Sequence, residues 1–151
     1  MITIIVAAMG LIATLGATWL SGEIARRKDR DNRVLEAKLV VYGECAGGLY
    51  EYLRVCFDRS DARIKNLPED EREPRRMAMY GMESRLRAVI GQVAILSGDE
   101  DLLAELETVR ESIRSIGTEP VEMDDLVERR HQALKEVDRV MRTARADMTR
   151  S

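Results

Sequence analysis

The sequence predicts an all-α fold, with one N-terminal transmembrane helix followed by a small antiparallel bundle of about four helices. The first twenty residues contain no charged side chain, whereas 34% of the whole chain is charged. After this stretch, apolar residues recur every three or four positions, as in amphipathic helices, and no alternating strand pattern competes. We therefore expect a transmembrane anchor at 1–21, a basic juxtamembrane segment at 22–34 and a soluble helical bundle at 35–149.

The anchor is predicted from length and hydropathy together. A helix from Ile2 to Leu20 would extend roughly 28 Å, which is close to the hydrocarbon thickness of a bilayer. A signal peptide would need basic residues before the apolar stretch and a small-residue cleavage site after it, and neither is present. A buried core helix is normally amphipathic, whereas this stretch is apolar on all sides.

The basic flank predicts the orientation of the anchor. Because Lys and Arg are retained on the cytoplasmic side of a membrane, we expect an inner-membrane (plasma-membrane) protein with its N-terminus outside and its bundle in the cytoplasm. The same side chains are placed to meet anionic lipid headgroups. The residues concerned are Arg26, Arg27, Lys28 and Arg30.

Small residues form a stripe along the predicted anchor, at spacings of 4, 3, 4, 3 and 4. Small side chains let two membrane helices approach closely, so the stripe is a candidate helix–helix seam. Gly, Ala and Thr are also common in such helices without any partner, and the two interpretations remain open. The stripe consists of Thr3, Ala7, Gly10, Thr14, Ala17 and Ser21.

Four helices are expected after the anchor, at 32–65, 74–96, 100–116 and 121–148. Pro68 and Pro74 mark the first break, because two prolines so close together cannot both lie inside one helix. The second break is the Ser97–Asp99 turn, and Gly117 ends the third helix. Short connections favour antiparallel packing of neighbouring helices.

Each helix has an apolar stripe that should face the core. The stripe of the first bundle helix begins at Leu35 and Leu39. The stripe of the third is Leu102, Leu106, Val109, Ile113 and Ile116. The stripe of the last is Val127, Arg130, Leu134, Val137, Met141, Ala144 and Met148, in which the arginine is a misfit.

The sequence offers no catalytic, cofactor-binding or metal-binding residue. His131 is the only histidine, so no histidine pair can bind a metal, and its charged surroundings indicate a solvated surface. Cys45 and Cys56 would lie roughly 16 Å apart along a helix, too far for a disulfide, and are interpreted as small core residues. The net charge of −3 gives no basic field for nucleic acid. No small-molecule substrate is inferred.

Several segments together resemble small, uncharacterised single-pass membrane proteins of GC-rich Gram-positive bacteria and their phages. They are the N-terminal span, the Arg26-Arg27-Lys28 flank, the Leu39-Val-Val-Tyr42 helix start, Leu86-Arg-Ala-Val-Ile90 and the Ser97-Gly98 junction. The resemblance covers most of the chain as an architecture. It implies no activity and no catalytic residues.

The expected function is therefore that of a non-enzymatic, membrane-anchored interaction or scaffold protein whose cytoplasmic bundle binds a protein partner. The expected partners are the membrane and either further copies of the chain or another membrane protein. Two alternatives remain open. One is a phage- or prophage-encoded membrane effector in superinfection exclusion, immunity or lysis, and the other is an envelope protein with its bundle outside.

Overall fold

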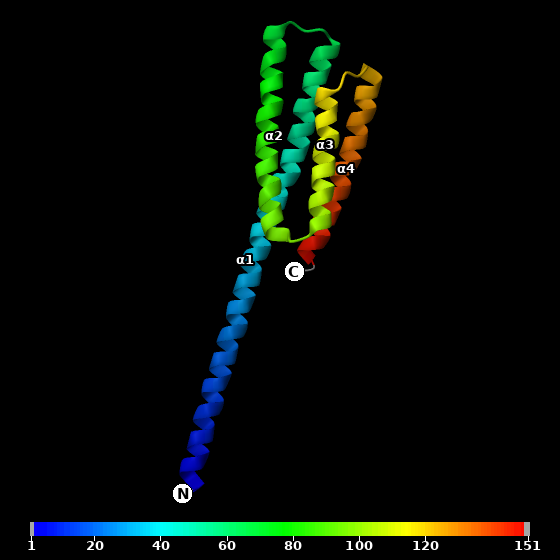
Figure 1. Ribbon diagram of the computed structural model, residues 1–151. Helices are drawn as coiled ribbons and strands as arrows, with labels where there is room; N and C mark the ends of the chain where they lie inside the picture. The colour runs from blue at the N-terminus through cyan, green and yellow to red at the C-terminus, as the bar shows by residue number, and fades with distance from the viewer. Residues whose placement is uncertain (1, 150–151) are drawn as a thin grey trace. The chain divides into compact units, whose positions relative to one another are not determined.

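The computed structural model describes the backbone of residues 2–149 and the side chains of residues 28–148. It contains α1 (Ile2–Ile64), α2 (Glu69–Ser97), α3 (Glu100–Thr118) and α4 (Met123–Thr149), and no strand among the described residues (Figure 1). The predicted all-helical class is confirmed. The chain divides into two compact units, Met1–Glu36 and Ala37–Ser151, and the features described below lie in the second unless stated otherwise.

Within the second unit, the C-terminal part of α1 and the three following helices form an up-and-down bundle with antiparallel neighbours (Figure 1). The core lies between the helices and is built mainly from aliphatic side chains. The predicted stripe of α3 is confirmed, since all five of its residues are buried. The largest fully buried side chains are Tyr52, Leu49, Met79, Leu86, Leu102, Leu106, Ile113, Ile116, Leu126, Val93, Val109 and Val137.

The connection between α2 and α3 forms as the sequence predicts. Gly98 ends α2 in the left-handed conformation, with φ of 64°, which a residue without Cβ adopts at little cost. Asp99 then caps α3, because its carboxylate accepts a hydrogen bond of 3.0 Å from the Leu102 backbone N–H. This turn fixes where the core stripe of α3 begins.

The start of α2 differs from the prediction. The helix begins at Glu69, five residues before the predicted start at Pro74, and Pro74 lies inside it. Pro68 occupies the cap position with extended backbone, and the acidic first turn of Glu69, Asp70 and Glu71 suits the positive end of the helix dipole. These effects outweigh the single backbone hydrogen bond that Pro74 cannot donate.

The core face of α4 agrees with the predicted stripe at Val137 and Ala144, which are buried, and differs from it at the start of the helix. Its buried residues are Leu126, Ala133, Val137, Val140, Ala144 and Asp147. Val127 is 40% exposed, and the misfit Arg130 is also exposed, with its guanidinium 4.8 Å above the ring of Phe57. At the start of the predicted α1 stripe, Leu35 and Leu39 are exposed as well, so the core begins at Lys38 and Tyr42.

The prediction of a transmembrane helix has to be corrected. Across the residues open to description, no helix is both long enough and apolar enough to cross a membrane. This contradicts the predicted single-pass membrane protein, its inner-membrane location and the placement of its bundle in the cytoplasm. The prediction rested on the hydropathy of 1–21, whose side chains lie outside the described residues, whereas each of α2, α3 and α4 carries charged residues along its exposed face.

Candidate functional site

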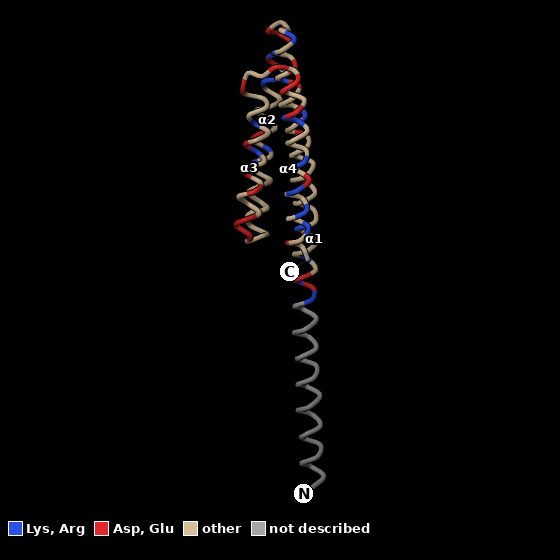
Figure 2. The backbone as a smooth tube through the Cα atoms, turned by 90° about the vertical axis from the view of Figure 1, so that its right-hand side faces the viewer, with Lys and Arg blue, Asp and Glu red and all other residues tan. Residues whose placement is uncertain are grey.

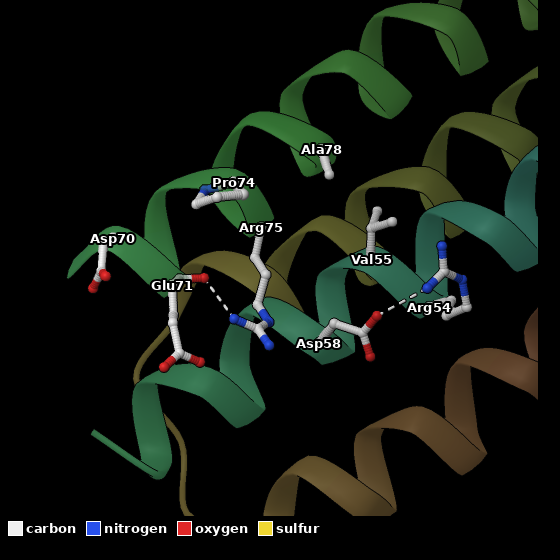
Figure 3. A pocket seen from close by; sticks show the side chains of 8 residues that line it. All are labelled: Arg54, Val55, Asp58, Asp70, Glu71, Pro74, Arg75 and Ala78. Atoms are coloured by element: carbon white, nitrogen blue, oxygen red, sulfur yellow. Dashed lines mark hydrogen bonds and ion pairs between the residues drawn. The ribbon is translucent and has the colours of Figure 1, made fainter. Parts of the chain in front are cut away.

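A groove with a volume of about 560 Å³ lies between α1 and the first half of α2 (Figure 3). Its lining side chains are Arg54, Val55, Asp58, Asp70, Glu71, Pro74, Arg75 and Ala78. Charged groups of both signs point into it. The groove therefore presents a mixed polar surface rather than a field of one sign.

The arginines of this groove already have partners. Arg54 donates to Asp58 at 3.1 Å, and the Arg75 guanidinium donates to the backbone carbonyl of Glu71 (Figure 3). No histidine, cysteine or serine lines the groove, whose titratable groups are carboxylates and arginines.

A second polar feature joins α2 to α3 around a single buried carboxylate. Glu83 accepts hydrogen bonds from Arg87 at 3.0 Å and from Arg110 at 3.1 Å, and Arg114 lies 3.6 Å away. Arg110 also pairs with Glu107 at 2.8 Å. A shallow groove of about 360 Å³ opens beside Glu83, lined also by Tyr80, Ser84, Arg87 and Arg114.

A third polar feature lies where the beginning of the core meets the end of α4. Lys38 and Tyr42 donate to the same oxygen of Asp147, at 3.1 and 2.5 Å. Burial and the hydrogen bond to Asp147 raise the pKa of Tyr42 to about 12. Burial acts to raise the pKa of Asp147, but the hydrogen bonds from Tyr42 and Lys38 outweigh it and hold that pKa below its ordinary value.

Sequence reasoning missed both buried ion pairs, although the sequence carries a signal for each. Lys38 lies four residues before Tyr42, in register with the α1 core, and Glu83 lies between Met79 and Leu86 on the α2 core face. A charged residue at a core position predicts a buried partner. The identity of that partner on another helix cannot be read from either stripe.

The outward side of α2 carries an uncharged surface, here named the outer α2 face. Its residues repeat at spacings of 4, 3, 4, 3 and 4 and are all exposed. They are Met77, Gly81, Ser84, Ala88, Gly91 and Ile95. Met77 is 59% exposed and Ile95 is 85% exposed, so large apolar side chains stand at both ends of this face.

The remaining predicted sites have different outcomes. The side chains of the seam at 3–21, and those of Arg26 and Arg27, lie outside the described residues, and Lys28 and Arg30 are exposed. His131 is exposed. Within residues 28–148, no group of His, Cys, Asp and Glu side chains could hold a metal ion.

Both cysteines are free and buried, as expected of small core residues. Burial raises the pKa of the Cys45 thiol to about 11 and that of the Cys56 thiol to about 12. A thiol needs its ionised form to act as a nucleophile. Neither thiol is therefore placed for chemistry at neutral pH.

Comparison with known proteins identifies the family. The curated proteins and the solved structures gave no match, and the resemblance to small proteins of Gram-positive bacteria and phages is tested by neither. Residues 39–148 match the model of a family described as KilB plasmid transfer protein. The matched region begins in α1 where the core begins and ends in the last turn of α4. Because it covers more than half of the 151 residues, the chain belongs to the KilB plasmid transfer protein family.

Proposed function

We propose that the chain takes part in plasmid transfer as a non-catalytic helical scaffold that binds other protein chains. The observation that carries this proposal is the family match over 39–148, because it covers the bundle itself. The match supports a role in plasmid transfer for the folded unit whose side chains are described.

The chemistry of the described residues supports binding rather than catalysis. Catalysis by an acid, a base or a nucleophile needs at least two such groups within hydrogen-bond reach of one reacting atom. In the described groove beside α1, Arg54 is paired with Asp58 and Arg75 with the backbone carbonyl of Glu71, and the two thiols of the chain are buried. Binding needs only a surface.

The outer α2 face is the surface that best fits a protein partner. Single exposed apolar residues are normal on proteins, whereas several on one face indicate an interaction site. Met77, Tyr80 and Ile95 are exposed on or beside this face. The buried interior of a protein–protein contact is depleted of charge, and the outer α2 face carries none.

The test is a transfer assay in cells that carry the plasmid and lack the coding sequence of this chain. We expect deletion to lower the transfer frequency and the wild-type chain to restore it. His131→Ala should restore transfer as well, because a scaffold needs no titrating side chain. Ile95→Glu should not restore it, whereas the matched control Val127→Glu, at an exposed apolar residue of α4, should.

Two outcomes would contradict the proposal. Deletion that leaves transfer unchanged would remove the role in transfer. Loss of transfer with His131→Ala, in a chain whose circular dichroism and melting temperature are unchanged, would point to chemistry rather than to a scaffold.

A further inference from the structure

No other helix of the bundle covers the outer α2 face, since all six of its residues are exposed. From Met77 to Ile95 the only acidic residue is Glu83, which is buried, so this face exposes no carboxylate. Figure 2 shows how the Lys and Arg residues and the Asp and Glu residues are distributed along the described helices. Removing apolar surface from water is favourable by about 25 cal/mol of free energy per Å², so burying this face against another chain would be stabilising.

The two glycines of this face leave room for another helix. A glycine inside a helix costs about 1 kcal/mol relative to alanine. A Cβ added at Gly81 or at Gly91 would meet nothing within 4 Å, so packing within the bundle does not require either glycine. Helix axes approach most closely where the contacting side chains are small. The centre of the outer α2 face is therefore shaped for close contact with a helix.

The spacing of this face is symmetric about Leu86. Met77 and Ile95 are each nine residues from Leu86, Gly81 and Gly91 are each five, and Ser84 and Ala88 are each two. If two copies of α2 pack antiparallel about a two-fold axis at this level, Met77 meets the other copy's Ile95, and small residues meet small residues. A two-fold contact must be self-complementary in this way.

Charge at the edge of the face supports the same arrangement. A Cβ at Gly48 of α1 would lie 3.2 Å from Leu86 Cδ1, so Gly48 faces α2 at the level of the symmetry centre. Glu44 is four residues before Gly48 and therefore shares its side of α1. Arg85 lies on α2 beside Leu86. Neither Glu44 nor Arg85 belongs to an ion pair within the described part of the chain.

The two-fold axis would bring these charges together. In each copy, one side of α2 borders α1. The two-fold axis places this side of α2 in one copy opposite the same side of α2 in the other copy. Arg85 of each copy then approaches Glu44 of the other at the rim of the contact. Opposite charges at a rim set orientation and raise the association rate more than they add affinity.

We propose that the outer α2 face joins two copies of this chain through an antiparallel, two-fold contact of α2 with α2 centred at Leu86. This inference rests on the proposed scaffold role and names a second copy as the partner. The central glycines permit close approach, Met77 and Ile95 close the two ends, and Arg85 and Glu44 fix the orientation.

The register is tested by disulfide trapping with the purified full chain. Ser84→Cys and Ala88→Cys chains are oxidised separately and as an equal mixture. We expect the mixture to give about tenfold more covalent dimer than either variant alone, because the two positions face each other only across the proposed axis. Native Cys45 and Cys56 are buried and serve as internal background. Ala104→Cys, at an exposed position of α3, is the matched control and should not be trapped.

The contact itself is tested by sedimentation over a range of concentrations. Gly91→Leu should give a monomer without a lower melting temperature, since its site is open in the bundle. Gly43→Leu, at an equally open glycine on α1, should leave the dimer intact. Arg85→Glu and Glu44→Arg should each raise the dimer dissociation constant by about tenfold, and the double variant should recover most of the loss.

The outcomes separate the dimer from the proposed function. A wild-type chain that is monomeric at all concentrations, or trapping of Ser84→Cys with itself in preference to Ala88→Cys, overturns the dimer. If such a chain still restores transfer and Ile95→Glu does not, the outer α2 face binds a different protein and the scaffold role stands. A dimer with the expected register in a chain that transfer does not need overturns the proposed function alone.

Discussion

The ammonium of Lys38 and the carboxylate of Asp147 lie 3.1 Å apart, although 109 positions separate them in the sequence. The pair joins α1, where the core begins, to the last turns of α4. Both residues are less than a tenth exposed, so the pair is shielded from water and salt. It anchors the C-terminal end of the chain to the helix with which the bundle starts.

Asp147→Asn should lower the free energy of unfolding by about 3 kcal/mol, because it removes the buried negative charge that lies 3.1 Å from the ammonium of Lys38. The measurement is urea unfolding at neutral pH. The control is Asp61→Asn, which removes a carboxylate from the surface pair with Lys65 and should cost less than about 1 kcal/mol. Equal losses in the two variants would show that the Lys38–Asp147 pair is not shielded.

Acid should weaken the bundle through the same carboxylate. The pKa of Asp147 is lower in the folded chain than its ordinary value of about 3.9. Its stabilisation is therefore complete above about pH 4 and is lost as the pH falls through the folded pKa. The difference in unfolding free energy between the wild type and Asp147→Asn should shrink between about pH 4 and pH 2. A constant difference over that range would exclude this linkage.

Base should act through Tyr42, whose surroundings include Lys38, Asp147, Ser97 and Asp99. Burial and the hydrogen bond to Asp147 raise the pKa of Tyr42 to about 12 from an ordinary value of about 10. The stabilisation is complete below about pH 10 and is lost as the pH rises through 12. The urea midpoint of the wild type should fall over this range, and Tyr42→Phe should remove that part of the fall.

The buried carboxylate of Glu83, which joins α2 to α3, should contribute about as much to the free energy of unfolding as the carboxylate of Asp147. Glu83→Gln removes the only buried one of the three carboxylates that pair with Arg110 and should cost about 3 kcal/mol in unfolding free energy. Glu107→Gln, which removes one of the two exposed partners of Arg110, should cost less than about 1 kcal/mol. Urea unfolding measures the loss in each variant. A larger loss for Glu107→Gln than for Glu83→Gln would show that Arg110 depends mainly on its neighbour in α3 and not on Glu83 of α2.

Much of the fold could be predicted from sequence because helix periodicity and helix ends are local properties. The α3 stripe was confirmed in full, since Asp99 caps the helix and the apolar residues are unambiguous. In α4, apolar residues follow both Leu126 and Val127 at helical spacing. The sequence therefore allows two neighbouring stripes, either of which could face the core. Packing selects the face with Leu126, and the exposed Arg130 then stacks on Phe57.

The polar contacts could be predicted far less well because they depend on pairs of distant residues. Nothing near Lys38 in the sequence indicates that Asp147 is its partner, and nothing near Glu83 indicates Arg110. The outer α2 face was missed for a different reason. The search for stripes followed large apolar residues toward the core, whereas this face consists mainly of small residues and is visible only once exposure is known.

Close approach of three helices at Gly117 gives a last prediction. A Cβ at Gly117 would lie 2.6 Å from Met79 Sδ and 3.2 Å from Cys56 Cβ, so α3 touches both α1 and α2 here. Met79 is fully buried and its sulfur accepts a hydrogen bond from Arg59, which limits its freedom to move. Gly117→Ala should therefore lower the unfolding free energy by about 1 kcal/mol, because the packing strain outweighs the helix-propensity gain.

The control for this position is Gly43→Ala, where an added Cβ meets nothing within 4 Å. Removing an exposed helical glycine should raise the unfolding free energy by up to about 1 kcal/mol. Thermal melting of the two variants should thus move in opposite directions from the wild type. If Gly117→Ala melted at a higher temperature, α3 would have room to move away from Cys56, and the close contact would not be needed to hold the three helices together.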